Sequence, residues 1–152
     1  MKFIDHWRYM MYVLRHKYFV FVGGRRLGVP VMQLVLHDWT KFLLIEWFAY
    51  VARMKDGRNS TWERAADTPE YARAWRHHWA ANPHHWVHWV INDVALPMPE
   101  KYILEMIADW FGAGMAQHKP DIAGWYATNG WRMNLHPTTR MIVESRLPLL
   151  SH

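Results

Sequence analysis

The spacing of apolar and polar residues along the chain is typical of α-helices. A first helix is expected over residues 5–22, and the pair Gly23-Gly24 is expected to end it. A second is expected to begin at Pro30 and to continue to about residue 55, before the turn-forming pair Asp56-Gly57. Further helices are expected over residues 69–81, 82–92, 99–117 and 137–147.

The remaining segments carry no clear periodicity. Residues 58–68 are polar and residues 118–135 are rich in Gly, Asn and Trp, so both are expected to be irregular. No segment alternates apolar and polar residues over the length of a strand. The sequence therefore predicts an all-α fold, a compact bundle of five to six helices in a single domain over residues 1–152.

The amino-acid composition limits the kinds of site that the protein can form. The 152 residues are 51% hydrophobic and 20% charged, which fits one globular domain. The chain has no cysteine, which excludes disulfides, thiolate metal sites and cysteine nucleophiles. Any metal ion must therefore be held by histidine nitrogens and carboxylate oxygens.

Length and charge also bear on location and partners. No apolar run reaches the roughly 18 residues of a membrane span, and the N-terminus lacks the apolar core of a signal peptide. A cytoplasmic protein without a membrane partner is expected. The formal net charge of +5 favours anionic partners such as nucleotides or nucleic acid, although many small proteins are equally basic.

The 11 histidines are not evenly distributed. Together with acidic residues they form a series on or at the ends of predicted helices that are far apart in sequence: His16, His37-Asp38, His77-His78, His84-His85 and Asp109. A helical bundle can bring such residues together in its interior, where metal sites are built from facing helices. The doublet His37-Asp38 follows an apolar run, so at least one member should be buried and should need a charged partner or a metal.

The segment His37-Asp38-Trp39-Thr40-Lys41 resembles the HD-x-x-K motif of the HD superfamily of metal-dependent phosphohydrolases. The resemblance implies that a metal ion is held by His16, His37, Asp38 and Asp109. It also implies that a second ion is held at His78, His84 and His85, as in HD proteins that bind two metals. Lys41 would lie beside the substrate phosphate, and Lys41, Asp38 and His84 would take part in catalysis.

A second resemblance extends further along the chain. A small phage-encoded HD-like family carries the patterns HD-x-[ST]-K-F, N-x-HHW and E-M-x-x-D-W, which stand here at residues 37–42, 82–86 and 105–110. It would place the protein in the cytoplasm of a bacterial host. It implies little about the substrate.

Several of these residues have a second interpretation. Side chains of His84 and His85 would point about 100° apart on a helix, so they would not serve one ion equally well. His88 would share a helix face with each of them, so which of these three histidines bind metal stays open. His78 is favoured over His77 by the family pattern alone. Glu105, four residues before Asp109, is either a hydrogen-bond acceptor for a ligating histidine or an ordinary solvated acid.

The function expected from these observations is a metal-dependent phosphohydrolase that acts on a nucleotide or another phosphate ester through a metal-activated water. It would use one or two divalent ions (Mn, Fe, Mg, Co or Zn). Two alternatives stay open: a di-iron oxygenase of HD type, and a non-enzymatic phage protein that binds nucleic acid or a host protein. The sequence has no phosphate-binding glycine loop and no G-x-S-x-G motif, and it leaves the substrate and the oligomeric state open.

Overall fold

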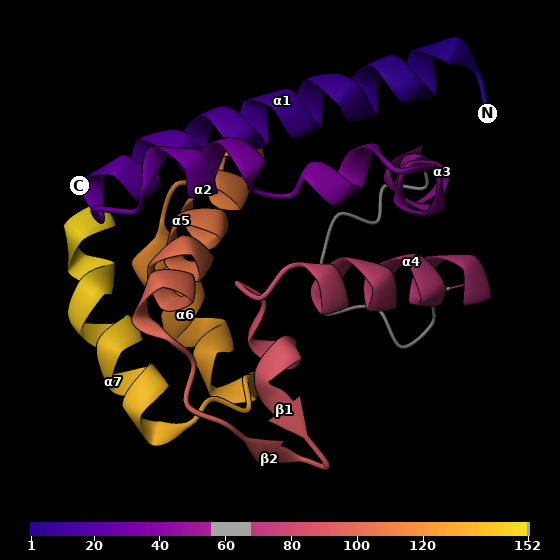
Figure 1. Ribbon diagram of the computed structural model, residues 1–152. Coiled ribbons are helices and arrows are strands. Elements are labelled where there is room, and N and C mark those ends of the chain that lie inside the picture. Colours follow the sequence, from indigo (N-terminus) through magenta and orange to yellow (C-terminus); the bar gives the residue numbers. More distant parts are fainter. Residues whose placement is uncertain (56–67, 152) are drawn as a thin grey trace.

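The computed structural model describes residues 1–55 and 68–151 and contains seven α-helices in those ranges (Figure 1). They are α1 (Phe3–Arg26), α2 (Val31–Leu36), α3 (Leu44–Lys55), α4 (Pro69–Ala81), α5 (Glu100–Ala116), α6 (Ile122–Asn129) and α7 (Pro137–Arg146). Short 3₁₀ helices are η1 (Trp39–Phe42), η3 (Trp86–Trp89), η4 (Gly130–Arg132) and η5 (Leu147–Leu150), and one antiparallel hairpin pairs β1 (Val90–Ile91) with β2 (Val94–Ala95). The all-α fold class is confirmed, with one or two more helices than expected.

The longest helix, α1, runs across the top of the molecule in Figure 1 and packs most extensively against α5. The two backbones approach closely at Gly112, where an added Cβ would lie 2.4 Å from Val20 Cγ2 and 3.1 Å from the His16 carbonyl oxygen. Because Gly112 has no side chain, α1 and α5 can pack this closely. This packing brings the middle of α1 beside the residues that follow Glu105 on α5.

Two apolar clusters form the core, and α1 contributes to both. The larger contains Val20 of α1 with Ile103, Met106 and Phe111 of α5, and the smaller contains Tyr9, Val13 and Val51. On the inward face of α1, His16 lies between Val13 and Val20. A buried histidine therefore stands where the two clusters meet.

The prediction that Gly23-Gly24 ends the first helix is wrong. α1 continues through both glycines to Arg26. Both are buried, and an added Cβ would lie 2.7 Å from Phe111 at Gly23 and 2.3 Å from Leu34 at Gly24. These glycines make room for neighbouring side chains and do not terminate the helix.

The prediction of one continuous helix from Pro30 to about residue 55 is also wrong. The chain forms α2, η1 and α3 there, and α2 ends at His37, which has φ −49° and ψ 127°. Asp38 follows in the left-handed region with φ 55° and ψ 25°. The backbone thus breaks at the His-Asp doublet itself.

Residues 82–92 do not form the expected helix. They form a turn, η3 and the first strand of the hairpin, whose two turn residues Asn92 and Asp93 have positive φ angles of 48° and 63°. Asn and Asp tolerate this conformation, and two such residues are typical of a tight hairpin turn. Residues 118–135 are also more regular than expected, because they include α6 and η4.

Other predictions are confirmed. α4, α5 and α7 match the expected helices closely, and the Thr68 hydroxyl accepts a hydrogen bond from the Tyr71 amide at the start of α4. The predicted breaker Asp56-Gly57 and the predicted loop at 58–68, apart from Thr68, lie outside the described residues. In the described part of the chain, none of the helices combines the length and the apolar character required for a membrane span.

Candidate metal centre

Five separate segments bring buried histidines and carboxylates to one place in the interior. His16 comes from the middle of α1, His78 from the last turn of α4 and Asp109 from α5. The doublet at 37–38 comes from the break after α2, and the pair at 84–85 from the turn after α4. The break explains how two adjacent residues can face one site, because neighbouring side chains on a helix would diverge by about 100°.

The first group of donor atoms contains the Nε2 atoms of His16 and His37, Asp38 Oδ2 and Asp109 Oδ1. His16 Nε2 lies 3.4 Å from the Asp38 oxygen and 3.1 Å from the Asp109 oxygen. His37 Nε2 lies 3.3 Å and 3.4 Å from the same two oxygens. Ligand atoms at about 2.1 Å from one ion lie about 3.0–3.4 Å from one another, so this spacing fits the first coordination sphere of a metal.

The second group is built on the other oxygen of the same aspartate. Asp38 Oδ1 lies 3.3 Å from His78 Nε2 and 3.4 Å from His84 Nε2. His85 Nε2 completes the group and lies 2.8 Å from His78 Nε2. Asp38 is fully buried and offers one oxygen to each group, which is the arrangement of a carboxylate that bridges two ions.

The hydrogen bonding of the buried nitrogen and oxygen atoms tests whether the two groups fit a metal ion. His16 Nε2, His37 Nε2, His84 Nε2 and Asp38 Oδ1 are buried and form no hydrogen bond with any described residue. Buried polar atoms are nearly always satisfied, because leaving one unpaired costs roughly 1–3 kcal/mol. All four point into the two donor groups, so a bound cation would satisfy each of them. These buried groups can therefore hold a metal ion.

Two glutamates orient the histidines from the outer side. His37 Nδ1 donates to Glu105 Oε1 over 2.9 Å, and His84 Nδ1 lies 3.4 Å from the same oxygen. His78 Nδ1 donates to Glu46 Oε2 over 2.9 Å. A proton held on Nδ1 leaves the Nε2 lone pair directed at the metal position, as is usual for ligating histidines.

The outer hydrogen bonds extend beyond the glutamates. Gln33 Nε2 donates to Glu105 Oε2 over 2.5 Å, and Asn82 Nδ2 donates to the Thr40 hydroxyl over 2.9 Å. Glu105, His37 and His84 also lie close enough to form a third possible metal group. The two His–Glu contacts of that group use the outer Nδ1 atoms, so we interpret it as hydrogen bonding behind the two other groups.

The charges of the site are strongly coupled. Burial raises the pKa of Asp38, but His37, Lys41 and His78 outweigh it and hold that pKa well below its ordinary value. Burial lowers the pKa of His37, but the neighbouring carboxylates of Asp38, Asp109 and Glu105 raise it well above the ordinary value. Burial beside His84 and His78 holds the pKa of His85 well below its usual range. The charged forms of His37 and Asp38 thus stabilise each other inside the buried site.

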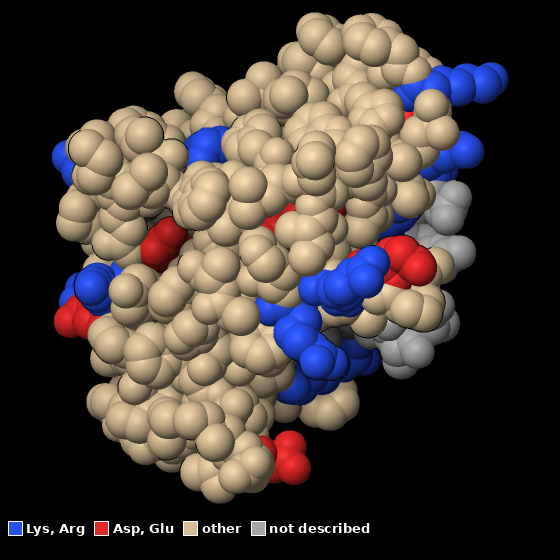
Figure 2. All heavy atoms as spheres, turned by 45° about the vertical axis from the view of Figure 1, so that its right-hand side comes forward, with Lys and Arg blue, Asp and Glu red and all other residues tan. Residues whose placement is uncertain are grey.

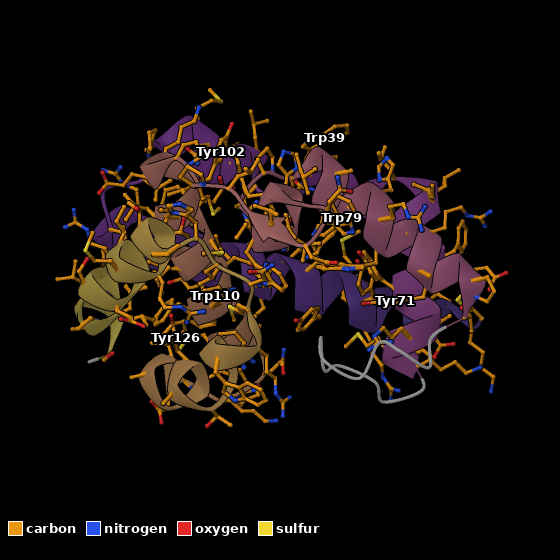
Figure 3. All side chains as sticks on the ribbon, turned by 90° about the horizontal axis from the view of Figure 1, so that it is seen from below. Trp39, Tyr71, Trp79, Tyr102, Trp110 and Tyr126 are labelled. Carbon is orange, nitrogen blue, oxygen red and sulfur yellow. The ribbon has the colours of Figure 1, made fainter. Side chains whose placement is uncertain are left out.

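A cleft of about 780 Å³ opens onto the site. His16, His78, His85 and Asp109 line it together with the cationic side chains Lys41, Arg53 and Lys119. Its other walls include many aromatic side chains, with Tyr71 of α4 and Trp110 of α5 on opposite sides in the view from below (Figure 3). The metal groups are thus reachable by a molecule the size of a nucleotide.

Lys41 lies on the wall of this cleft. It belongs to η1, and its ammonium group donates to Asp38 Oδ2. The 3₁₀ turn of η1 brings the Lys41 side chain back to the doublet. Its contact with Asp38 and its position on the cleft wall fit a cation that faces both the metal groups and an incoming anion.

All seven residues expected to bind metal lie in the two groups: His16, His37, Asp38, His78, His84, His85 and Asp109. Among the alternatives left open, His77 instead donates Nδ1 to Glu46 Oε1 over 2.7 Å, and His88 contacts the Trp79 carbonyl oxygen. The expected conflict between His84 and His85 does not arise, because they occupy a turn and not a helix. Glu105 is an acceptor for a histidine and not a solvated acid.

Glu46 is the main functional candidate that the sequence analysis missed. It interrupts the apolar run 42–52, is completely buried and accepts from both His77 and His78. A charged residue in an apolar helix face requires a partner when it is buried, so this interruption was the available signal. Gln33 and Asn82 carried no comparable signal, because single amides are common at helix surfaces and caps.

The sequence profile of one protein family matches residues 5–148, which is nearly the whole chain. The chain belongs to DUF5662, a family of unknown function. No curated protein and no solved structure matches it. For this DUF5662 chain, both donor groups, the two glutamates and the cleft-lining Lys41 lie within the matched range.

Proposed function

We propose that the protein is a metal-dependent phosphohydrolase that acts on a nucleotide or another phosphate ester. The observation that carries this proposal is the bridging position of Asp38, with one oxygen in each of two donor groups at the end of an open cleft. Paired metal sites of this kind are common in phosphatases and nucleases. The proposal is also supported by the resemblance between the His37-Asp38 motif and the motif of the HD superfamily.

Bound divalent ions would supply an activated water and would polarise a phosphoryl oxygen. The chain's own residues fix where that chemistry takes place. Asp38 holds the two groups together, Glu105 and Glu46 fix the orientation of the histidines, and the burial of both carboxylates keeps bulk water from those contacts. Preorganised groups of this kind act strongly because they need no rearrangement during the reaction.

Lys41 and the aromatic walls account for substrate binding in this proposal. The Lys41 ammonium group lies against Asp38 at the cleft, where it can stabilise negative charge on a phosphate oxygen. Tyr12, Tyr71, Trp75 and Trp110 offer flat apolar surfaces along the same cleft. Such surfaces suit the organic part of a phosphate ester, including a nucleobase.

A phosphate-release screen with added Mn, Fe, Mg, Co or Zn tests the proposal. The substrates would be nucleoside mono-, di- and triphosphates, cyclic nucleotides and p-nitrophenyl phosphate. We expect turnover with at least one ester, and a loss of about 10²–10³-fold in Lys41→Gln with its metal content unchanged. Lys101→Gln is the matched control, because Lys101 is exposed on α5 and contacts the Tyr102 ring.

The proposal fails if metal-loaded protein releases phosphate from none of these esters. It also fails if Lys41→Gln and Lys101→Gln turn over equally. The donor set of five histidines and two aspartates, one of them shared by both groups, also suits iron, which favours an oxygenase as the second candidate. Iron-loaded protein that consumes oxygen and leaves every phosphate ester intact would support that function instead.

A further inference from the structure

A stripe of exposed apolar side chains runs along the outer face of α1. Its members are Ile4, Trp7, Met11, Leu14, Tyr18 and Phe21, each between 38% and 63% exposed. Their spacing alternates between three and four residues over the length of the helix. A strict 3-4 stripe of this kind is the seam by which one helix packs against another.

This stripe is separate from the core. The buried positions Tyr9, Val13, His16 and Val20 follow a second 3-4 stripe, which lies about 180° away around a helix of 3.6 residues per turn. α1 is therefore apolar on two opposite faces, and the described residues cover only one of them. A helix that is apolar on both faces is normally buried on both.

The neighbouring elements widen the stripe into a face. α2 packs beside α1, and the Lys17 ammonium group donates to the Val35 carbonyl oxygen over 3.2 Å. Met32, Val35 and Leu36 of α2 and Trp39 of η1 are each more than half exposed. In Figure 2 a broad tan area covers the middle of the upper part of the molecule, where α1 and α2 lie in Figure 1, and blue atoms lie at its edges.

We propose that this face is the interface of a homodimer, in which α1 packs against α1 of a second copy. A half-exposed large apolar side chain offers roughly 100 Å², so the stripe and its α2 and η1 neighbours together offer on the order of 1,000 Å². A stable interface needs about 800 Å² on each partner. Aromatic and Met side chains with few charges are also the composition of an interface core.

A second copy fits this surface because a two-fold interface pairs the same patch on both subunits. In such a dimer the 3-4 stripe of one copy packs against the same stripe of the other, and a helix seam of this kind needs a complementary apolar partner. The formal net charge of +5 makes two copies repel each other, so higher salt should strengthen the pairing by screening this repulsion. This inference uses no residue of the metal groups and does not depend on the proposed function.

Light scattering coupled to size-exclusion chromatography of the full chain, at about 10–100 µM and at low and high salt, tests the dimer. We expect the mass of two chains in the wild type and of one chain in Leu14→Glu, with the wild-type dimer favoured by salt. Met141→Glu is the matched control, because Met141 is 64% exposed on α7 and should leave the dimer intact. A monomeric wild type, or a dimeric Leu14→Glu, overturns the proposal.

A second variant tests the interface without breaking it. The chain has no cysteine, so Leu14→Cys introduces one thiol at the middle of the stripe. We expect a short bismaleimide to cross-link this variant into dimers and to leave Met141→Cys monomeric on denaturing gels. Equal cross-linking of the two variants overturns the proposal. So does a monomer that binds vesicles of acidic phospholipid and is released by salt, since the face would then serve a lipid surface.

Discussion

Asp38 occupies an unusual backbone conformation for the role that its side chain has. Its φ of 55° lies in the left-handed region, which costs a non-glycine residue about 1 kcal/mol or more. Asp and Asn are among the residues that tolerate it best. The conformation follows the end of α2 and turns the carboxylate inward, where each oxygen lies within 3.4 Å of two histidine nitrogens.

Glu105 gives a residue-scale prediction about how the histidines are held. The hydrogen bonds from His37 and His84 outweigh the effect of burial and lower the pKa of Glu105 to about 2, so it is ionised at neutral pH. We expect Glu105→Gln to keep the fold but to weaken metal affinity by about 10–100-fold, because the neutral amide orients His37 less strongly. Isothermal titration with Mn or Zn measures this affinity.

Glu100→Gln is the control for that titration. Glu100 lies on the same helix, is exposed and pairs only with Arg146 among the described residues. Its affinity for metal should equal that of the wild type, since an exposed ion pair contributes about 0–1 kcal/mol. Equal metal affinity in Glu105→Gln and Glu100→Gln would show that Glu105 does not orient the metal-binding histidines.

At the scale of elements, the site depends on how closely α1 and α5 approach. His16 of α1 lies 3.1 Å from Asp109 of α5, and Gly112 lies one turn further along α5. The nearest atoms to an added Cβ at Gly112 include the Val20 backbone nitrogen at 2.8 Å, which cannot move without moving α1. The separation of the helices and the spacing of the first donor group are therefore linked.

Gly112→Ala should test this link. We expect a loss of about 1–3 kcal/mol in the free energy of unfolding, because the added methyl group forces the helices apart. We also expect the ion held by His16 and Asp109 to be lost before the ion held by the second group. Urea denaturation and elemental analysis measure the two effects. Unchanged stability together with unchanged metal content would contradict the account.

The element scale also shows why some boundaries were predictable and others were not. Thr68 and Pro137 are local start signals, and the helices that follow them were predicted correctly. Gly23 and Gly24 carry the same local signal as a helix end, yet both are needed to make room for Phe111 and Leu34, which lie in other helices. Long-range packing of this kind leaves no trace in the local pattern.

For the whole molecule, the sequence indicated the metal donors better than it indicated their scaffold. The seven donors were named from the order of His and Asp residues and from a family resemblance, and all seven meet in the structure. The break at Asp38 and the turn that carries His84 could not be derived from periodicity. Each depends on contacts between segments that are far apart along the chain.

The central claim is that Asp38 joins two metal sites, and the metal content of purified protein tests it most directly. Elemental analysis after incubation with Mn, Fe, Co or Zn would compare the wild type with Asp38→Ala and with the control His88→Ala, whose side chain contacts the Trp79 carbonyl oxygen outside both groups. Circular dichroism would confirm that each variant is folded. We expect up to two ions per chain in the wild type and in His88→Ala, and none in Asp38→Ala. A wild type that takes up no metal, or a folded Asp38→Ala that keeps the wild-type content, would contradict the account.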